Sequence, residues 1–463
     1  MLGAGISGMA GALAMRRAGW SVTVLEAETR PGGRCLTLRT GDIVREDGHP
    51  EQRIGWDAAP HLYFNPGPAR IPHHHRAVLG LCRDLGVPLE PLVNENRAAS
   101  LRSDASGGTT LPLRRVAADL RGTVAELAAK SLTRAALDGP FTEADLGALR
   151  SMLRGFGALD ADGRYRGSRR AGWAEPPGAA SPGVAHAPLD PRLLLDPAFW
   201  ATASFAEGVD YAATMLQPVG GMDRIAAALH AALGDSVLLG CEVASLRRGG
   251  GGGARVAWRQ DGAPREARFD RVLCTLPPPL LAALDTDLPP ERRAALRSLA
   301  QHPAGKLAFH APRRFWEEDD AIYGGIAWTT GDATQLWYPS HGFHAAGGGV
   351  LVGAYAWDAG PALRFAARTP AERAASAASD GEALHPGYAR EVAHPVSVSW
   401  PNMPRARGAW TEWTEEQRRD LQPMLRAPEG PYHFAGEYLS FLPGWQEGAV
   451  LSAWAAVEAM AAG

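Results

Sequence analysis

Cysteine is scarce in this chain. Only four cysteines occur among the 463 residues, and no two of them form a CxxC pair. A disulfide framework and a cysteine-based zinc site are therefore not expected, and a reducing, cytoplasmic location is favoured. The four are widely spaced, at Cys35, Cys82, Cys241 and Cys274.

Long apolar runs and a strong excess of one charge are also absent. No uninterrupted apolar run reaches about 18 residues, so no membrane span is predicted, and we recognise no signal peptide before the first motif. The formal net charge of −3 favours neither nucleic acid nor an anionic membrane as the main partner. With 46% hydrophobic and 21% charged residues, the composition indicates a globular protein of two or three domains.

Glycine is abundant, with 54 residues, and it forms a motif at the start of the chain. Gly3, Gly5 and Gly8 make a GxGxxG pattern that opens a helix, and SVTVL at residues 21–25 is a candidate buried strand that ends at Glu26. In a dinucleotide fold, such glycines let the backbone approach a pyrophosphate, the helix N-terminus faces it, and the acid suits ribose hydroxyls. The spacing therefore predicts a dinucleotide site.

A second glycine motif, Arg30-Pro-Gly-Gly-Arg34, follows directly. The stretch from Gly3 to Arg34 resembles the flavin amine oxidases, in which this second motif also contacts FAD, so the resemblance implies FAD rather than NAD. The chain departs from the family in one respect, because only Met1 and Leu2 stand where a Rossmann sheet has a strand of about five residues. Either that strand is shortened, which would weaken FAD binding, or the start of the chain is assigned too late.

Three later segments extend the resemblance along the chain: QPVGGMDRI at residues 217–225, VLLGCEV at 237–243 and FAGEYLSFLPGWQEGAVLSAW at 434–454. The resemblance implies that the backbone of Val243 meets the adenine edge and that Glu437 bonds the ribose or ribityl chain. The cofactor-binding residues implied in this way are Gly3, Gly5, Gly8, Glu26, Arg34, Gly67, Pro68, Val243, Gly436, Glu437 and Gln446.

Two segments in the middle of the chain bear on the substrate. The stretch YFNPGPARIP at residues 63–72 resembles L-amino-acid oxidases, in which the arginine, here Arg70, holds the substrate α-carboxylate. A guanidinium can pair bidentately with a carboxylate, and the prolines stiffen the segment that aims it. In QLWYP at 335–339, Tyr338 aligns with the tyrosine that makes a second bond to the carboxylate. The alternatives are a structural ion pair for Arg70 and strand packing for Tyr338.

The resemblance also implies a lysine and two aromatic walls beside the flavin. Lys306 matches a lysine that binds a water near flavin N5, where it could assist proton removal or the reaction with oxygen. Trp410 and Trp445 would form two walls that hold the reacting Cα–N bond over N5. Ala409 stands where monoamine oxidases carry a flavin-linked cysteine, so the FAD is expected to be non-covalent. An exposed strand lysine and core tryptophans are the alternatives.

Three consecutive histidines, His73 to His75, raise the question of a metal site. Adjacent histidines on a helix point in different directions, and no carboxylate or cysteine cluster accompanies them in the sequence. We therefore expect a surface run at the start of a helix and no metal, although one of the three could reach the active-site entrance.

The resemblance implies an α/β protein of mixed α and β character, with a discontinuous Rossmann-type FAD-binding domain, a mixed β-sheet substrate domain and a helical insert that builds an entrance funnel. The expected bounds are 1–57, 210–300 and 425–463 for the FAD domain, 58–104 and 301–424 for the substrate domain, and 105–209 for the insert.

The expected activity is FAD-dependent oxidation of an L-amino acid by dioxygen, giving a 2-oxo acid, ammonia and hydrogen peroxide. Three alternatives remain open: an amine oxidase that does not recognise a carboxylate, an amino-acid monooxygenase on the same fold, and a flavin-poor scaffold or binding protein. Family members are often dimers, which makes a homodimer a further expectation, although no interface is legible in the sequence.

Overall fold

The computed structural model describes residues 1–462, apart from the side chain of Ala136, and its FAD-binding region is built on a parallel sheet. β1 (Val24–Leu25) pairs with β11 (Val237–Leu238), and β15 (Val272–Cys274) pairs with β22 (Tyr432–Phe434). Leu2 joins these two halves, because it forms parallel bridges to both Leu25 and Cys274. The strand position before the first glycine is thus held by a single bridging residue.

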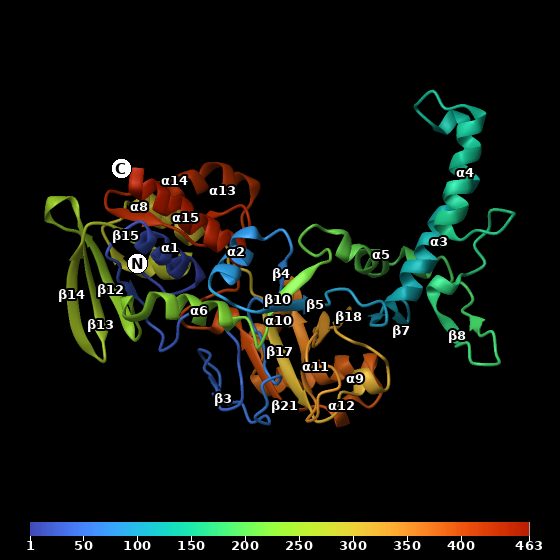
Figure 1. Cartoon of the computed structure of the whole chain (residues 1–463), viewed down its shortest axis with the longest axis horizontal. Helices are drawn as coiled ribbons and strands as arrows, with labels where there is room; N and C mark the ends of the chain where they lie inside the picture. Colours follow the sequence, from blue (N-terminus) through green and yellow to red (C-terminus); the bar gives the residue numbers. More distant parts are fainter. Residues whose placement is uncertain (463) are drawn as a thin grey trace.

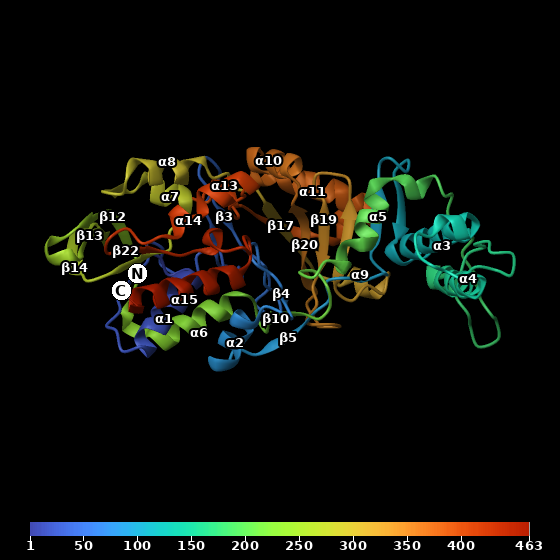
Figure 2. The ribbon, with the colours of Figure 1, turned by 90° about the horizontal axis from the view of Figure 1, so that it is seen from above.

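Three helices cover this sheet: α1 (Ile6–Arg17), α6 (Asp223–Leu233) and α15 (Gln446–Ala462). Figure 2 shows them side by side, with α1 next to both of the others. Their inner faces share one core, in which Met9, Leu229 and Val450 are fully buried. An antiparallel meander flanks the sheet and consists of β12 (Cys241–Arg248), β13 (Ala254–Gln260) and β14 (Ala263–Phe269).

The second large unit is a seven-stranded mixed sheet with the strand order β21-β17-β20-β19-β18-β6-β7. Its neighbours are antiparallel except for β18 and β6, which run parallel. The α/β fold with a mixed substrate sheet is therefore as predicted. The strands are β21 (Ala393–Ser399), β17 (Gly305–Ala311), β20 (Gly349–Ala356), β19 (Gln335–Tyr338), β18 (Gly325–Thr329), β6 (Ser100–Ser103) and β7 (Thr109–Pro112).

The helical insert begins later than the sequence suggested. β7 falls within the stretch assigned to the insert, but it pairs along its length with β6 and completes the substrate sheet. The insert therefore starts with α3 (Leu113–Ser131) and continues with α4 (Glu143–Gly157) and α5 (Pro197–Ser204). Figure 1 shows α3 and α4 projecting from the body of the molecule, whereas α5 lies against it. Only the end of the insert can therefore contribute to an entrance.

A small antiparallel sheet connects the two large units. β10 (Met215–Pro218) lies between β4 (Ile71–Pro72) and β5 (Leu89–Leu92). The ends of these strands bring together the segments around residues 70, 94 and 211. The pairing of β10 with β4 and β5 therefore also positions the candidate substrate site.

The remaining elements are shorter or peripheral. They are β2 (Ile43–Val44), β3 (Gln52–Arg53), α2 (Arg76–Asp84), β8 (Trp173–Glu175), β9 (Val184–Ala185), α7 (Pro278–Ala283), β16 (Asp285–Thr286), α8 (Pro290–Ser298), α9 (Phe315–Glu318), α10 (Ala359–Ala367), α11 (Pro370–Leu384), α12 (Tyr388–Glu391), α13 (Glu415–Asp420) and α14 (Gln422–Arg426). None of the helices in the described part of the chain is long and apolar enough to cross a membrane.

Candidate active site

A cavity of about 600 Å³ runs from the start of α1 to the substrate sheet. The first glycine motif forms one end of it, because Gly3 and Gly5 line the cavity. At Gly8 a Cβ would lie 2.0 Å from the Gly3 carbonyl oxygen, so only glycine lets α1 pack this closely. The Ser7 hydroxyl, in the first turn of α1, is buried without a hydrogen-bond partner. A free hydroxyl and a helix N-terminus fit a phosphate group.

Glu26 lies at the end of β1, as its place in the sequence predicted. Its carboxylate accepts hydrogen bonds from the backbone N–H groups of Ala4 (2.7 Å) and Glu28 (2.8 Å), and burial raises its pKa above the ordinary value. The two backbone bonds fix this side chain in the wall of the cavity. It is therefore placed at the end of the cavity where a dinucleotide would present its ribose.

At the other end of the cavity, Arg34 and Glu437 form an ion pair of 2.8 Å. Arg34 also donates to the Ala409 carbonyl oxygen (2.8 Å), and Glu437 accepts from the Gly444 N–H (3.1 Å). Glu437 thus holds Arg34 and the turn before α15 in place. At Gly67 a Cβ would lie 2.1 Å from the Arg34 carbonyl oxygen, so glycine is required there as well.

The structure brings together the residues that the resemblance assigned to the cofactor. Ten of the eleven line this one cavity, and Gly8 packs directly behind Gly3. Ala409 is also in the wall. The glycine turns, the free hydroxyl of Ser7 and the volume of the cavity all fit an FAD molecule. The ten lining residues are Gly3, Gly5, Glu26, Arg34, Gly67, Pro68, Val243, Gly436, Glu437 and Gln446.

A second cavity of about 220 Å³ adjoins the first and contains Arg70. The Arg70 side chain is buried, and its Nη1 donates to the Asn94 Oδ1 at 2.7 Å. Among residues 1–462 no carboxylate forms an ion pair with it. Instead, four aromatic rings surround the guanidinium, with centroids 4.8 to 6.0 Å from its Cζ: Phe205, Tyr211, Trp337 and Trp445.

Tyr338 does not reach this cavity, so its assignment to the carboxylate is wrong. Its hydroxyl forms a hydrogen bond with His385 Nε2 in the core on the face of the sheet that points away from Arg70. Side chains alternate between the two faces along a strand, and the neighbouring Trp337 of β19 occupies the face toward Arg70. The tyrosine that lines the second cavity together with Arg70 is Tyr355 of β20. We call this second cavity the chamber. The alternation of sides within QLWYP was the signal that could have corrected the assignment.

Lys306 is buried in β17 between the two cavities and lines both. Its Nζ donates to the carbonyl oxygens of Gly67 (2.7 Å) and Asn65 (3.3 Å) and lies 4.6 Å from the centre of the Tyr355 ring. Burial, with a smaller contribution from the charge of Arg70, lowers its pKa to about 7. An exposed strand lysine is therefore excluded.

Trp410 and Trp445 also line both cavities and lie where the two meet. Trp410 stacks on His302 with ring centroids 4.1 Å apart, and Trp445 meets the edge of His75 at 5.0 Å. Each tryptophan is thus fixed from behind by a histidine. Their free faces form two aromatic walls of the chamber.

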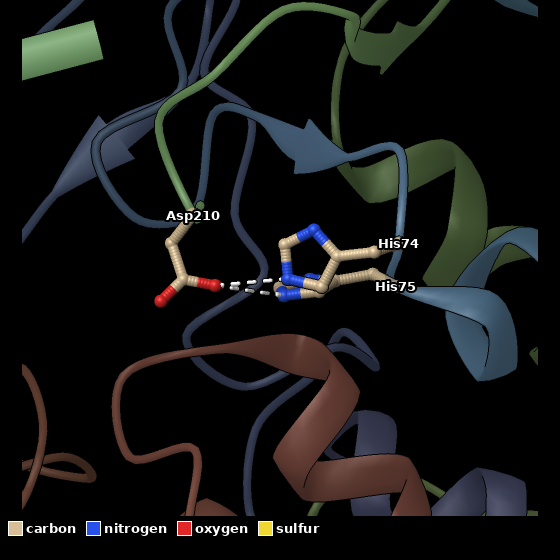
Figure 3. Close-up of side chains that lie close together, drawn as sticks. All are labelled: His74, His75 and Asp210. Carbon is tan, nitrogen blue, oxygen red and sulfur yellow. Dashed lines mark hydrogen bonds and ion pairs between the residues drawn. The ribbon is translucent and has the colours of Figure 1, made fainter. Parts of the chain in front are cut away.

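The three histidines are not a uniform surface run. His73 is exposed, His74 is partly buried, and His75 is 2% exposed and lines the chamber. Asp210, which precedes Tyr211, approaches both inner histidines, as Figure 3 shows. The expectation of a surface run is wrong for His75, because the chain returns from the insert and covers it.

The fold and the two joined cavities define an FAD-binding oxidoreductase with an aromatic substrate chamber. The chain matches the flavin containing amine oxidoreductase family over residues 6–461, and it belongs to this family. It is 26% identical to an L-amino-acid oxidase of Vipera ammodytes ammodytes over 469 residues, covering 98% of this chain and 90% of that protein. A putative L-amino-acid oxidase of Bacillus subtilis (strain 168) is 24% identical, with 98% and 92% covered.

Solved structures of amine oxidases share the fold. Putrescine oxidase bound to putrescine superimposes with a TM-score of 0.64 at 22% identity, covering 100% of this chain and 98% of that one. Cyclohexylamine oxidase from Brevibacterium oxydans IH-35A also gives a TM-score of 0.64, with 21% identity and 100% of this chain covered. These structures show the fold, and the family match makes the chain a flavin-dependent amine oxidoreductase with FAD as its cofactor.

Proposed function

We propose that this enzyme oxidises an L-amino acid and recognises it by its α-carboxylate. The observation that carries the proposal is Arg70, a buried cation that faces the chamber without an acidic partner among the described residues. Burying an unpaired charge is costly unless something compensates for it. A substrate carboxylate supplies the missing partner, and a guanidinium can bind it with two parallel hydrogen bonds.

The charge of the whole chamber supports the same substrate class. Arg70 and Lys306 are both in its wall, whereas no aspartate or glutamate is among the residues that line it. A diamine would bring two further positive charges into this cavity, where like charges repel strongly because the dielectric constant is low. An amino acid brings one carboxylate and can enter with its amine neutral.

The residues around Arg70 would hold the guanidinium and position the rest of the substrate. Asn94 holds the guanidinium, and it also donates to the Tyr211 carbonyl oxygen at 2.9 Å, which fixes the aromatic face beside it. Tyr355 offers a hydroxyl in the same chamber. Trp410 and Trp445 leave a slot in which the Cα–N bond of a bound amino acid faces the FAD cavity.

Lys306 is suited to hold or release a proton beside the reacting amine. Its pKa near 7 means that both protonation states are accessible at neutral pH. FAD, when bound, supplies the two-electron oxidant that dioxygen regenerates. The overall reaction converts amino acid, dioxygen and water to 2-oxo acid, ammonia and hydrogen peroxide.

The test is anaerobic mixing of the FAD-loaded protein with common L-amino acids and with the amines that result from their decarboxylation. We expect an amino acid to bleach the flavin absorbance while its matched amine does not, and peroxide and ammonia to form in equal amounts when air is admitted. Bleaching by amines alone would refute the role of Arg70 and identify an amine oxidase. An amide and carbon dioxide as products would identify a monooxygenase.

A further inference from the structure

The cluster His74, His75 and Asp210 has no role in the site described so far, apart from the contact of His75 with Trp445 and its place in the chamber wall. His74 and His75 end the turn before α2, and Asp210 lies on the chain that returns from the insert, 136 residues after His74. Figure 3 shows both imidazoles directed at the same carboxylate oxygen. The Asp210 Oδ1 is 3.0 Å from the His74 Nε2 and 3.7 Å from the His75 Nε2.

A hydrogen bond explains only part of this arrangement. The His74–Asp210 distance suits one, but 3.7 Å from His75 is too long. The His75 Nε2 is buried and without a hydrogen-bond partner, although it points at Asp210. A nitrogen with a lone pair or a proton is thus left unsatisfied inside the protein, which indicates a missing ligand.

The spacing fits a metal ion. In a tetrahedral site with metal–nitrogen bonds of about 2.0–2.1 Å, neighbouring ligand atoms are about 3.3 Å apart. The two measured distances, 3.0 and 3.7 Å, fall on either side of this value, and one ligand atom from each residue lies within 4.8 Å of the others. Two imidazoles and one carboxylate are a ligand set that zinc and similar divalent ions accept.

We propose that His74, His75 and Asp210 bind a divalent transition-metal ion such as Zn²⁺ next to the substrate chamber, whose wall includes His75. The side chains of His74 and Asp210 are 32% and 31% exposed, so solvent can supply the fourth ligand. The ion joins the start of α2 to the segment that carries Tyr211. It thereby fixes the aromatic face beside Arg70 and the histidine that supports Trp445.

The experiment uses tag-free, FAD-loaded protein that is treated with EDTA, dialysed and titrated with zinc chloride. Bound zinc is measured by mass spectrometry after gel filtration, and affinity is measured by calorimetry. The variants are His74→Ala and Asp210→Asn, both at partly exposed positions where the fold should survive. His73→Ala is the matched control, because His73 is an exposed neighbour outside the cluster.

We expect one zinc ion per chain in the wild type and in His73→Ala, together with a rise in the melting temperature when zinc is added. Removing a direct ligand should weaken binding at least about 10-fold, since even the loss of an outer-shell partner has an effect of that size. The proposal is overturned if the wild type retains no zinc, if either cluster variant binds as tightly as the wild type, or if His73→Ala loses the ion as well.

Discussion

The sharpest consequence of the chamber concerns the substitution Arg70→Met. Methionine keeps an unbranched apolar stem and removes the guanidinium, and with it the charge that faces the chamber. The loss of a buried, charge-assisted contact to a carboxylate weakens binding by about 2–5 kcal/mol. At about 1.36 kcal/mol per factor of ten, kcat/KM for the best L-amino acid should fall by about 30- to 5,000-fold.

The matched amine should respond in the opposite direction. It has no carboxylate to lose, and its positive charge no longer meets that of Arg70, so its kcat/KM should stay the same or rise. Both values come from the rate of anaerobic flavin bleaching at increasing substrate concentration. The oxidised flavin spectrum of the variant shows whether the cofactor site is intact.

Arg97→Met serves as the control for this substitution. Arg97 pairs with Glu95 at the surface, with side chains 47% and 40% exposed, and it does not line the chamber. Its removal should leave both substrates unaffected. Equal losses for the amino acid and its amine in Arg70→Met would refute the reasoning, because they would mean that Arg70 supports the fold of the chamber and does not recognise the carboxylate.

Four further outcomes are expected. Tyr355→Phe should raise KM for the amino acid by about 2- to 13-fold, the effect of one hydrogen bond of 0.5–1.5 kcal/mol, whereas Tyr338→Phe should leave KM unchanged because its hydroxyl bonds elsewhere. Acid precipitation should release all the flavin into the supernatant, as measured by absorbance, because Ala409 offers no thiol to which the flavin could be linked. The unfolded chain keeps the Lys306 proton up to about pH 10.5, whereas the folded protein releases it near pH 7. Between these two pH values the unfolded state binds more protons, so the free energy of unfolding rises with pH. Denaturant unfolding should show this contribution as about 2 kcal/mol between pH 7 and pH 9, and it should be missing in Lys306→Met. Arg373→Met should lower the free energy of unfolding by about 3–5 kcal/mol, because it leaves the buried Glu46 carboxylate without its positively charged partner. In the wild type this carboxylate lies 2.8 Å from the Arg373 guanidinium, and both side chains are fully buried. A loss below 1 kcal/mol would contradict this expectation.

The cofactor site was predictable because its information is local. Each of its main motifs fixes the shape of the backbone within a few residues. These motifs are GxGxxG, the acid after the strand and the segment around Glu437. Sterics leave little choice at Gly8 and Gly67, where a Cβ would collide with a carbonyl oxygen. Such positions belong to short motifs through which the resemblance to the flavin amine oxidases is recognised, and ten of the eleven implied residues line one cavity.

The substrate chamber was less predictable because it depends on register and on contacts between distant segments. Tyr338 and Tyr355 both lie on strands of the same sheet, and the side that each faces is set by a shift of one residue. Tyr211 and Asp210 follow the helical insert in the sequence. The sequence around residues 73–75 does not predict that they lie beside Arg70 and the histidines. The boundary before β7 was misplaced for the same reason, since its strand character comes from its partner β6.

These two kinds of information correspond to two kinds of function. The residues that would hold FAD include glycines in turns where a Cβ would collide with the backbone, so their positions depend little on the residues of the chamber. The residues around Arg70 come from four separate segments, and only two of these adjoin the small sheet of β4, β10 and β5. The four segments carry Asn94, Phe205 with Tyr211, Trp337 and Trp445. A change in any one of these segments can alter the charge of the chamber without disturbing the cofactor. Under the proposed function, Arg70 is the residue that selects the substrate class, because a carboxylate can pair with its buried charge whichever side chain the substrate carries.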